Sequence, residues 1–190
     1  MPETAGSARR LQLPASPVVV RDLRAGETVL LNGYLYSARD AAHRRLVEAL
    51  RRGETPPIPL EGQFIYYLGP TPPGPGRIIG SAGPTTASRM DPYTPELLAA
   101  GVLGLIGKGS RSPAVREALV KHGAVYLGAV GGLGALLSRR IVECRVAAYP
   151  DLGPEAVRHL RVEDFPATVI GDAHGGDWYE EARRRYRLLD

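Results

Sequence analysis

The chain has 190 residues, and its 44% of hydrophobic and 23% of charged residues are ordinary values for a globular domain. No apolar run is long enough to span a membrane, and no apolar region follows Arg9 and Arg10. We therefore expect no membrane association and no secretory signal, and we place the chain in the cytoplasm. The net charge of +4 at pH 7 suits an acidic small molecule, a nucleic acid or an acidic protein surface.

Residues that could bind a metal are few and scattered. Cys144 is the single cysteine, so it cannot close an internal disulfide, whereas an iron–sulfur cluster or a structural zinc needs three or four ligands. The histidines show no metal-ligand spacing (His43, His122, His159 and His174). We therefore expect no metal held by this chain, and we interpret Cys144, which lies in an apolar run, as a buried inert thiol.

The chain begins with an irregular segment followed by a strand. Residues 1–17 contain Pro, Ser and Gly without periodicity, which predicts a flexible arm or an extended segment ordered only against a partner. Residues 28–36 are rich in apolar and aromatic side chains and predict a strand.

A helix with an unusual first turn follows this strand. Ser37 is its predicted N-cap, and Gly53 marks its end. Arg39 in the first turn faces the positive end of the helix dipole, which is unfavourable unless an anion lies nearby. Asp40 or a bound anion could supply that charge. His43, one turn later, could orient Arg39 or face solvent.

Residues 80–91 have the composition of an anion-binding loop. Gly80 and Gly83 allow backbone conformations in which successive amide N–H groups point into one concavity. Arg89 adds a planar fork of donors suited to a carboxylate or a phosphate, and three hydroxyl groups add neutral donors (Thr85, Thr86 and Ser88). The alternative is a strand-to-helix turn whose hydroxyl groups cap the next helix, with Arg89 on the surface.

The central part of the chain alternates strands and helices. Strands are predicted at residues 63–68, 102–106 and 124–127, with two intervening helices that begin at the N-caps Thr94 and Ser112. This order predicts an α/β fold with a parallel βαβαβ segment. Ligands of such sheets bind at the carboxyl ends of strands, where residues 85–89 and Lys108 would emerge.

Lys108 lies between two glycines at the end of the second of these strands. The segment lacks the earlier glycine and the following Ser or Thr of a nucleotide P-loop, so we exclude that motif. Lys108 is then either a point charge close to an anionic substrate or an exposed loop lysine.

The C-terminal part predicts another strand and a basic helix. Residues 164–172 read as a late strand in which Phe165 and Pro166 pack into the core. Residues 179–190 predict a helix that carries several arginines, and we favour a solvated or partner-facing helix over a nucleic-acid patch. We therefore expect no nucleic acid among the partners.

Four segments together resemble one known family. They are the Gly83-Pro84-Thr85-Thr86 run followed by Arg89-Met90-Asp91, the Ala38-Arg39-Asp40-Ala41-Ala42-His43 run, the turn around Lys108, and residues 164–178. They resemble the C-terminal domain, or separate beta subunit, of the iron–sulfur (class I) fumarate hydratases and the related tartrate dehydratases. The resemblance covers about residues 22–178 and implies a swivelling β/β/α domain, here residues 18–178.

The resemblance also implies a function and a set of site residues. It implies that the chain is the beta subunit of a hydro-lyase and that a partner alpha subunit holds a 4Fe-4S cluster. The two subunits are implied to form a heterotetramer, and this chain a homodimer when it is isolated. The implied catalytic residues are Thr85, as the base, and Lys108. Arg39, Arg89 and Thr86 are implied to bind the dicarboxylate, with His43, Asp40 and Gly83 in supporting roles. Fumarate hydration to (S)-malate is our first hypothesis, ahead of tartrate dehydration or a non-catalytic dicarboxylate-binding scaffold.

Overall fold

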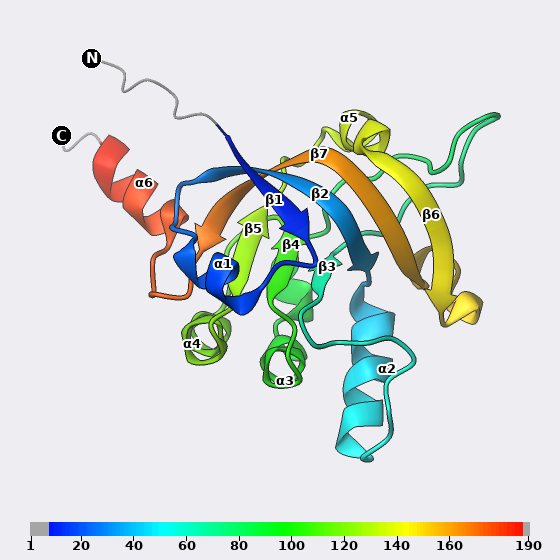
Figure 1. Cartoon of the computed structure of the whole chain (residues 1–190), viewed down its shortest axis with the longest axis horizontal. Helices are drawn as coiled ribbons and strands as arrows, with labels where there is room; N and C mark the ends of the chain where they lie inside the picture. The colour runs from blue at the N-terminus through cyan, green and yellow to red at the C-terminus, as the bar shows by residue number, and fades with distance from the viewer. Residues whose placement is uncertain (1–7, 188–190) are drawn as a thin grey trace.

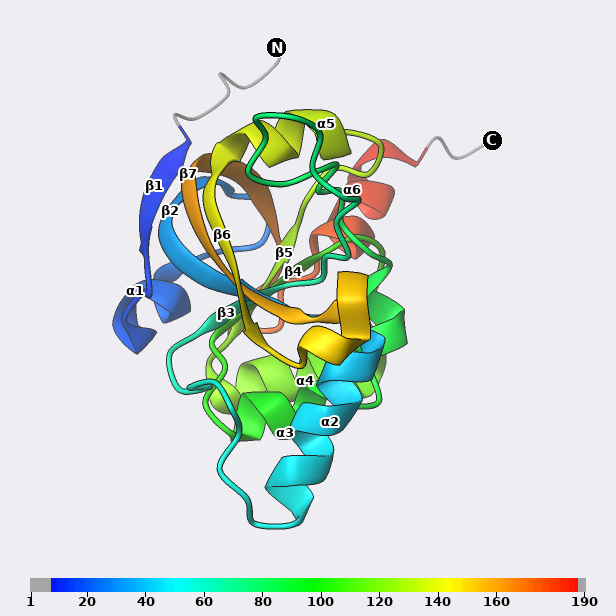
Figure 2. The ribbon, with the colours of Figure 1, turned by 90° about the vertical axis from the view of Figure 1, so that its right-hand side faces the viewer.

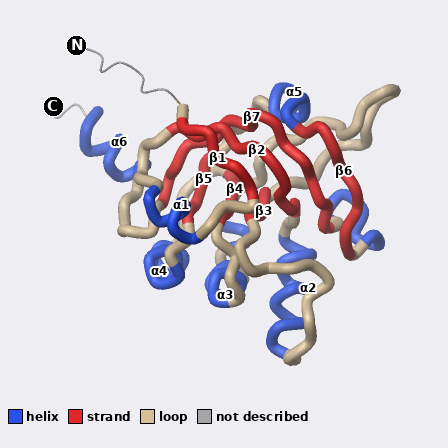
Figure 3. Tube along the Cα trace, viewed as in Figure 1, coloured by secondary structure: helices blue, strands red, loops and turns tan. Residues whose placement is uncertain are grey.

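Seven strands form one mixed sheet on which the helices pack (Figures 1 and 3). The structure is a computed structural model that describes residues 8–187. The strands are β1 (Arg9–Leu13), β2 (Thr28–Ser37), β3 (Phe64–Tyr66), β4 (Gly104–Gly107), β5 (Val125–Gly128), β6 (Ile141–Ala148) and β7 (Val157–Gly171). The helices are α1 (Pro17–Asp22), α2 (Asp40–Arg51), α3 (Thr94–Ala99), α4 (Pro113–His122), α5 (Gly134–Leu137) and α6 (Trp178–Tyr186). Short 3-10 segments are η1 (Ala87–Met90), η2 (Ser138–Arg140) and η3 (Pro150–Glu155).

The strand pairings close a ring. β2, β3, β4 and β5 lie side by side and parallel, and β7 runs antiparallel to both β5 and β2, which joins the two ends of that row. β1 pairs with β2 and β6 pairs with β7, both outside the ring. Figure 2 shows β2, β7 and β6 curving beside one another.

Alternating side chains of the strands fill two hydrophobic layers. Phe64 and Tyr66 of β3 join Phe165 of β7 in a cluster shared by the strands of the ring. Ile65 and Tyr67 point the other way, into the layer that also holds apolar side chains of α2, α3 and α4. Figure 1 shows these three helices on the same side of the sheet. Because each fully buried apolar side chain contributes about 1.5–3 kcal/mol, the two layers fix the orientation of every ring strand.

The parallel βαβαβ segment predicted for the centre of the chain is confirmed. β3, β4 and β5 are parallel neighbours, and α3 and α4 connect them. α4 has the predicted start and end, because Ser112 Oγ accepts from the Val115 N–H at 3.4 Å and Gly123 adopts the left-handed conformation at φ 66°. The mixture of helices and strands agrees with the predicted α/β class.

Four local predictions are wrong. Thr94 does not cap α3: it is the first residue of that helix, and Tyr93 occupies the N-cap position without a side-chain capping bond. Residues 9–13, placed in a flexible arm, form β1, because Leu11 and Leu13 are buried when this segment pairs with β2; residues 1–7 of that arm lie outside the described residues. Ser37 does not cap α2: it ends β2, and Arg39 occupies the N-cap position without a side-chain capping bond. Pro166 is exposed, whereas its neighbour Phe165 is fully buried, as alternation along β7 requires.

α6 corresponds to the predicted C-terminal helix. It covers most of residues 179–190 and begins one residue earlier, at Trp178, while residues 188–190 lie outside the described part of the chain. Asp177 is its N-cap and accepts hydrogen bonds from the N–H groups of Tyr179 and Glu180. Among the helices described, none is both long and apolar enough to cross a lipid bilayer.

Candidate active site

Four neighbouring strands of the ring end at one edge of the sheet. β2, β3, β4 and β5 are parallel, so their carboxyl ends lie together, where ligands of such sheets bind. The pairing continues past the end of β2, because the Ala38 N–H donates to the Tyr66 carbonyl at 3.1 Å. Arg39 lies two residues beyond β2 and Lys108 directly follows β4. Arg39 and Lys108, two of the three candidate cations, therefore leave the sheet at this edge.

Arg39, Asp40 and Arg89 form one ion-pair cluster. Arg89 Nε donates to Asp40 Oδ1 at 2.7 Å, and Arg39 Nε lies 3.6 Å from Asp40 Oδ2. Glu155 adds a second carboxylate, with Oε1 3.5 Å from Arg39 Nη2 and Oε2 accepting from the Ala41 N–H at 3.0 Å. The side chain of Arg89 is 51% exposed and that of Arg39 20%. Of the two anions considered for the first turn of the helix, Asp40 or a bound anion, Asp40 does lie beside Arg39. Asp40 lies closer to Arg89 than to Arg39.

Gly69 leaves the space that the Arg39 side chain occupies. A Cβ atom at Gly69 would lie 2.6 Å from Arg39 Nη1 and 2.9 Å from Arg39 Cδ, well inside contact distance. Gly69 lies two residues beyond Tyr67, whose carbonyl accepts the Thr85 N–H at 2.7 Å. The segment after β3 thus lies between Arg39 and the threonine-bearing loop.

Thr85, Thr86 and Lys108 lie on two adjacent extended segments. The Lys108 N–H donates to the Thr85 carbonyl at 3.2 Å, and the Ala87 N–H donates to the Lys108 carbonyl at 2.8 Å. Thr86 and Lys108 are therefore directly paired in a parallel bridge, so their side chains leave the backbone on the same side. A Cβ at Gly131, which follows β5, would lie 3.6 Å from Lys108 Nζ.

The predicted cradle of backbone amides in residues 80–91 is wrong. Neither Gly80 nor Gly83 has a positive φ. Gly80 is instead required by the close approach of the backbone of Thr71, whose carbonyl oxygen would lie 2.2 Å from an added Cβ. Five amide groups of the segment donate to acceptors within the protein, those of Ser81, Ala82, Thr85, Ala87 and Asp91. Side chains, rather than successive amides, are thus the groups this loop offers to an anion.

His43 is buried and neutral beneath Arg39. Its Nδ1 lies 2.9 Å from the Arg39 carbonyl oxygen, so this nitrogen carries the proton and donates. Burial lowers the pKa of His43 to about 4. Its Nε2 has no hydrogen-bond partner among the described residues, and its ring packs edge-on against Tyr67 at 5.2 Å. The alternative that His43 faces solvent is therefore wrong.

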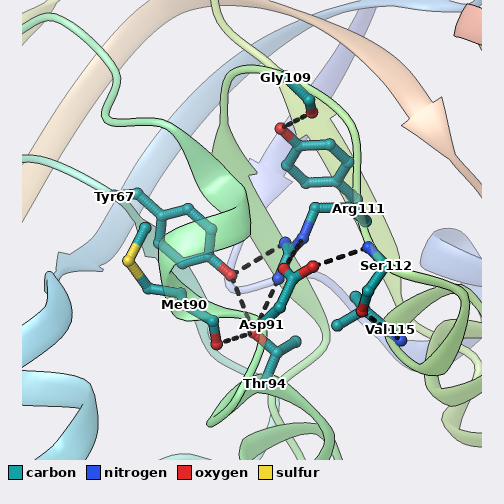
Figure 4. A network of polar contacts seen from close by, with 9 residues as sticks. Tyr67, Met90, Asp91, Thr94, Gly109, Arg111, Ser112 and Val115 are labelled. Carbon is teal, nitrogen blue, oxygen red and sulfur yellow. Dashed lines mark hydrogen bonds and ion pairs between the residues drawn. The ribbon is translucent and has the colours of Figure 1, made fainter.

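A buried network around Arg111 was not predicted (Figure 4). Arg111 Nε donates to Asp91 Oδ1 at 2.7 Å, and the side chain of Arg111 is 1% exposed. Asp91 lies at the end of the loop that carries Arg89, and Arg111 lies three residues after Lys108. The sequence contained one signal: Asp91 belongs to the segment on which the family resemblance was based.

The residues of this chain do not fit an iron–sulfur cluster. Such a cluster takes several thiolate ligands, and the chain has only Cys144, which is half-buried with its thiol pKa raised by burial. Within residues 8–187, no group of three or more His, Cys, Asp or Glu side chains is arranged to hold a metal ion.

An open groove of about 1050 Å³ lies between α6 and the turn after β4. It is lined by Gly109, Tyr179, Arg183 and Tyr186, among others, whereas Arg39, Arg89 and Thr85 are not among its lining residues. Its size therefore does not mark the candidate active site, which the cation and hydroxyl side chains define.

Comparison with known proteins identifies several relatives. The family described as Fumarase C-terminus matches residues 2–182. The chain is 42% identical over 155 residues to the aerobic class I fumarate hydratase of Salmonella typhimurium, which covers 80% of this chain and 26% of that protein. It is 41% identical over 174 residues to fumarate hydratase 2 of Leishmania major, covering 90% of this chain and 29% of that protein. The chain thus spans less than a third of these hydratases.

One relative has a similar length. The chain is 36% identical over 172 residues to a putative L(+)-tartrate dehydratase subunit beta of Methanocaldococcus jannaschii, covering 87% of this chain and 88% of that protein.

Proposed function

This chain belongs to the Fumarase C-terminus family, and from that premise we propose that it is the beta subunit of a two-subunit iron–sulfur hydro-lyase that hydrates fumarate to (S)-malate. The observation that carries the proposal is the grouping of cations and hydroxyl groups at one edge of the sheet. Arg39, Arg89 and Lys108 lie there on segments that hydrogen-bond to one another. Such a set can bind both carboxylates of a four-carbon dicarboxylate.

We assign substrate binding to the two arginines and Thr86. Asp40 contacts Nε of Arg89, so the terminal nitrogens of Arg89 are the atoms that we assign to one substrate carboxylate. Arg39 binds the other carboxylate with the guanidinium group that lies over Gly69. Thr86 donates its hydroxyl group to the substrate from the side of the backbone that Lys108 shares. Asp40 and His43 hold the arginines in place, and Gly83 supports the loop where its backbone packs against Gly134 of α5, at which an added Cβ would lie 2.9 Å from the Gly83 nitrogen.

We assign the proton at carbon to Thr85. Hydration adds a hydroxyl group to one alkene carbon and a proton to the other, and the reverse reaction removes that proton. A threonine alkoxide is costly at neutral pH, so Thr85 needs a cation nearby. Lys108 lies on the adjacent hydrogen-bonded segment, on the side that it shares with Thr86, and we assign to it the stabilisation of negative charge on the substrate.

The cluster of the proposed enzyme belongs to a partner. Because this chain has one cysteine, we propose that a cluster-bearing alpha subunit supplies the 4Fe-4S group and the rest of the site. The assembly would be a heterotetramer, and the isolated chain a homodimer. The beta-subunit name of the Methanocaldococcus jannaschii relative supports such a division.

Tartrate dehydration is the second candidate. The chain covers 88% of the length of the relative named as a putative L(+)-tartrate dehydratase subunit beta. The two reactions share the need for two carboxylate-binding cations and a proton acceptor. Assays of the reconstituted complex with fumarate and with L(+)-tartrate distinguish them.

Replacement of Arg89 tests the proposal. We expect Arg89→Ala to assemble with the alpha subunit but to lose most activity, because it removes one carboxylate ligand at a half-exposed position. Loss of one charge-assisted contact predicts a fall in kcat/KM of about 10- to 150-fold. Arg44→Ala is the matched control, since Arg44 is 62% exposed and, among residues 8–187, forms only a 4.0 Å ion pair with Glu48 of α2. Normal kcat/KM in Arg89→Ala would remove Arg89 from the site.

A scaffold that binds dicarboxylates without chemistry makes a different prediction. It requires the isolated chain to bind fumarate or malate tightly in calorimetry. The hydro-lyase proposal expects weak binding and no turnover from the isolated chain, and activity only after the alpha subunit is added.

A further inference from the structure

Arg111 is a charged side chain that is buried among Tyr67, Asp91 and Thr94 (Figure 4). Each nitrogen atom of its guanidinium group donates a hydrogen bond to a different part of the chain. Nε donates to Asp91 at 2.7 Å, Nη1 to the Tyr67 hydroxyl at 3.1 Å, and Nη2 to Thr94 Oγ1 at 2.7 Å. The guanidinium carbon also lies 5.3 Å from the ring centre of Tyr67 and 4.9 Å from that of Tyr126.

The partners of Arg111 hold the loop that carries Arg89. Asp91 lies two residues after Arg89, and its Oδ2 also accepts from the Ser112 N–H at 2.7 Å. Thr94 Oγ1, which accepts from Arg111, donates to the Met90 carbonyl at 2.8 Å. Arg111 therefore fixes both residues that directly follow Arg89.

The same network reaches the turn that carries Lys108. Arg111 itself ends this turn, and the Tyr126 hydroxyl beside it donates to the Gly109 carbonyl at 2.8 Å. Gly109 directly follows Lys108. Both ends of the short segment from Lys108 to Arg111 are thus held by polar contacts of buried side chains, those of Tyr126 and Arg111.

Tyr67 connects the network to Thr85 and to Arg39. Its hydroxyl accepts from Arg111, while its carbonyl accepts the Thr85 N–H at 2.7 Å. Its ring also packs edge-on against His43, which donates to the Arg39 carbonyl. Thr85 is therefore two contacts from Arg111, and Arg39 is three.

We propose that Arg111 is a positioning residue that holds the Lys108 turn in register with the Arg89 loop. Its importance for catalysis rests on the proposed function, but its effect on the two segments does not. A planar fork with donors in three directions is the feature used here, and a lysine cannot reproduce it. A role limited to stability would weaken the whole domain and leave the relative placement of the two segments unchanged.

Arg111→Lys and Tyr126→Phe separate these roles. Lysine keeps a positive charge opposite Asp91 and loses the directed contacts to Tyr67 and Thr94. Phenylalanine keeps the ring of Tyr126 and removes only the bond to the Gly109 carbonyl, so it serves if Arg111→Lys folds poorly. Arg116→Lys is the control, because the Arg116 side chain is also paired with carboxylates, but with those of Asp177 and Glu180 at the start of α6 rather than with Asp91.

Amide hydrogen exchange of the isolated chain is the first measurement. The reporters are the N–H groups of Lys108 and Ala87, which join the two segments, and the reference is the Val169 N–H, which bonds to the Glu27 carbonyl at 2.9 Å. We expect exchange of the reporters to accelerate about tenfold in both network variants beyond any change at Val169, since local opening lowers protection only locally. Equal changes at reporters and reference would overturn the proposal.

Kinetics of the complex with the alpha subunit is the second measurement. We expect kcat for fumarate in Arg111→Lys to fall about 10- to 100-fold in assembled complex, because small misplacement of reacting groups has effects of that size. KM changes less, and Arg116→Lys behaves as wild type. An unchanged kcat despite faster local exchange would show that Arg111 does not position groups for the reaction. A wild-type complex inactive on both fumarate and tartrate would refute the proposed function, while amide exchange would still decide the placement role.

Discussion

Gly69→Ala is the substitution that tests the position of Arg39 most directly. The added methyl group would lie 2.6 Å from Arg39 Nη1 and 2.9 Å from Arg39 Cδ. Since carbon contacts are most favourable at about 3.5–4.0 Å, the guanidinium group must retreat by about 1 Å. The clash involves the end of a flexible side chain, so the arginine moves and the backbone does not.

The expected effect is on catalysis rather than on folding. Gly69 does not have a positive φ, so alanine fits its backbone, and the free energy of unfolding should change by no more than about 1 kcal/mol. A charge-assisted contact is worth about 1.5–3 kcal/mol, so its loss lowers kcat/KM by about 10- to 150-fold. Because Arg39 is assigned to ground-state binding as well as to the transition state, we expect KM to rise.

Steady-state kinetics of the assembled complex, with urea unfolding of the isolated chain, measure both effects. Gly74→Ala is the matched control, because Gly74 lies in the same proline-rich loop, has no positive φ and would place its Cβ in open space. If Gly69→Ala and Gly74→Ala give the same kcat/KM, either Arg39 does not bind substrate or its observed position is not the one used.

Two further predictions concern stability. The pKa of His43 is lowered to about 4 in the folded protein, so the unfolded chain binds a proton first as pH falls from about 6.5. Wild type should therefore lose about 2 kcal/mol more unfolding free energy than His43→Asn between about pH 7.5 and pH 5, measured by urea denaturation; parallel curves would contradict this. Burial alone would raise the pKa of Asp172, but three backbone N–H donors hold it below its ordinary value. We expect Asp172→Asn to lower the free energy of unfolding by about 1–3 kcal/mol at neutral pH, with normal kinetics after assembly; an unchanged unfolding curve would show that these bonds add nothing.

Local signals predicted the central fold well. The start of α4 at Ser112 and its end at Gly123 could be predicted from the sequence, because both residues act through the backbone geometry of their near neighbours. β1 was missed because its two buried leucines, Leu11 and Leu13, gain their stability from β2, about twenty residues later in the chain. β7 begins at Val157, earlier than predicted. Its first half was missed because charged side chains occupy its outward positions.

The candidate site was predictable only in part. The rule that ligands gather at carboxyl ends of parallel strands predicted residues 85–89 and Lys108 at one edge, and the family resemblance added Arg39. The contact between Arg89 and Asp40 joins residues 49 positions apart and has no local signal. Arg111 was missed for the same reason: an arginine reads as a surface residue until its buried partners, Asp91 and Tyr67, are brought together by folding. The roles assigned to these residues stay predictions.

The late position of β7 has a consequence for how the protein is made. During synthesis β2 leaves the ribosome long before β7, yet Thr28 must pair with Thr168 to close the ring. Contacts between such distant residues form slowly, because a long loop must be closed before any bond is gained. The nascent chain should therefore complete the ring, and with it the edge that carries the candidate site residues, only in one late step. Until then its unpaired strands are the segments that a chaperone would need to shield.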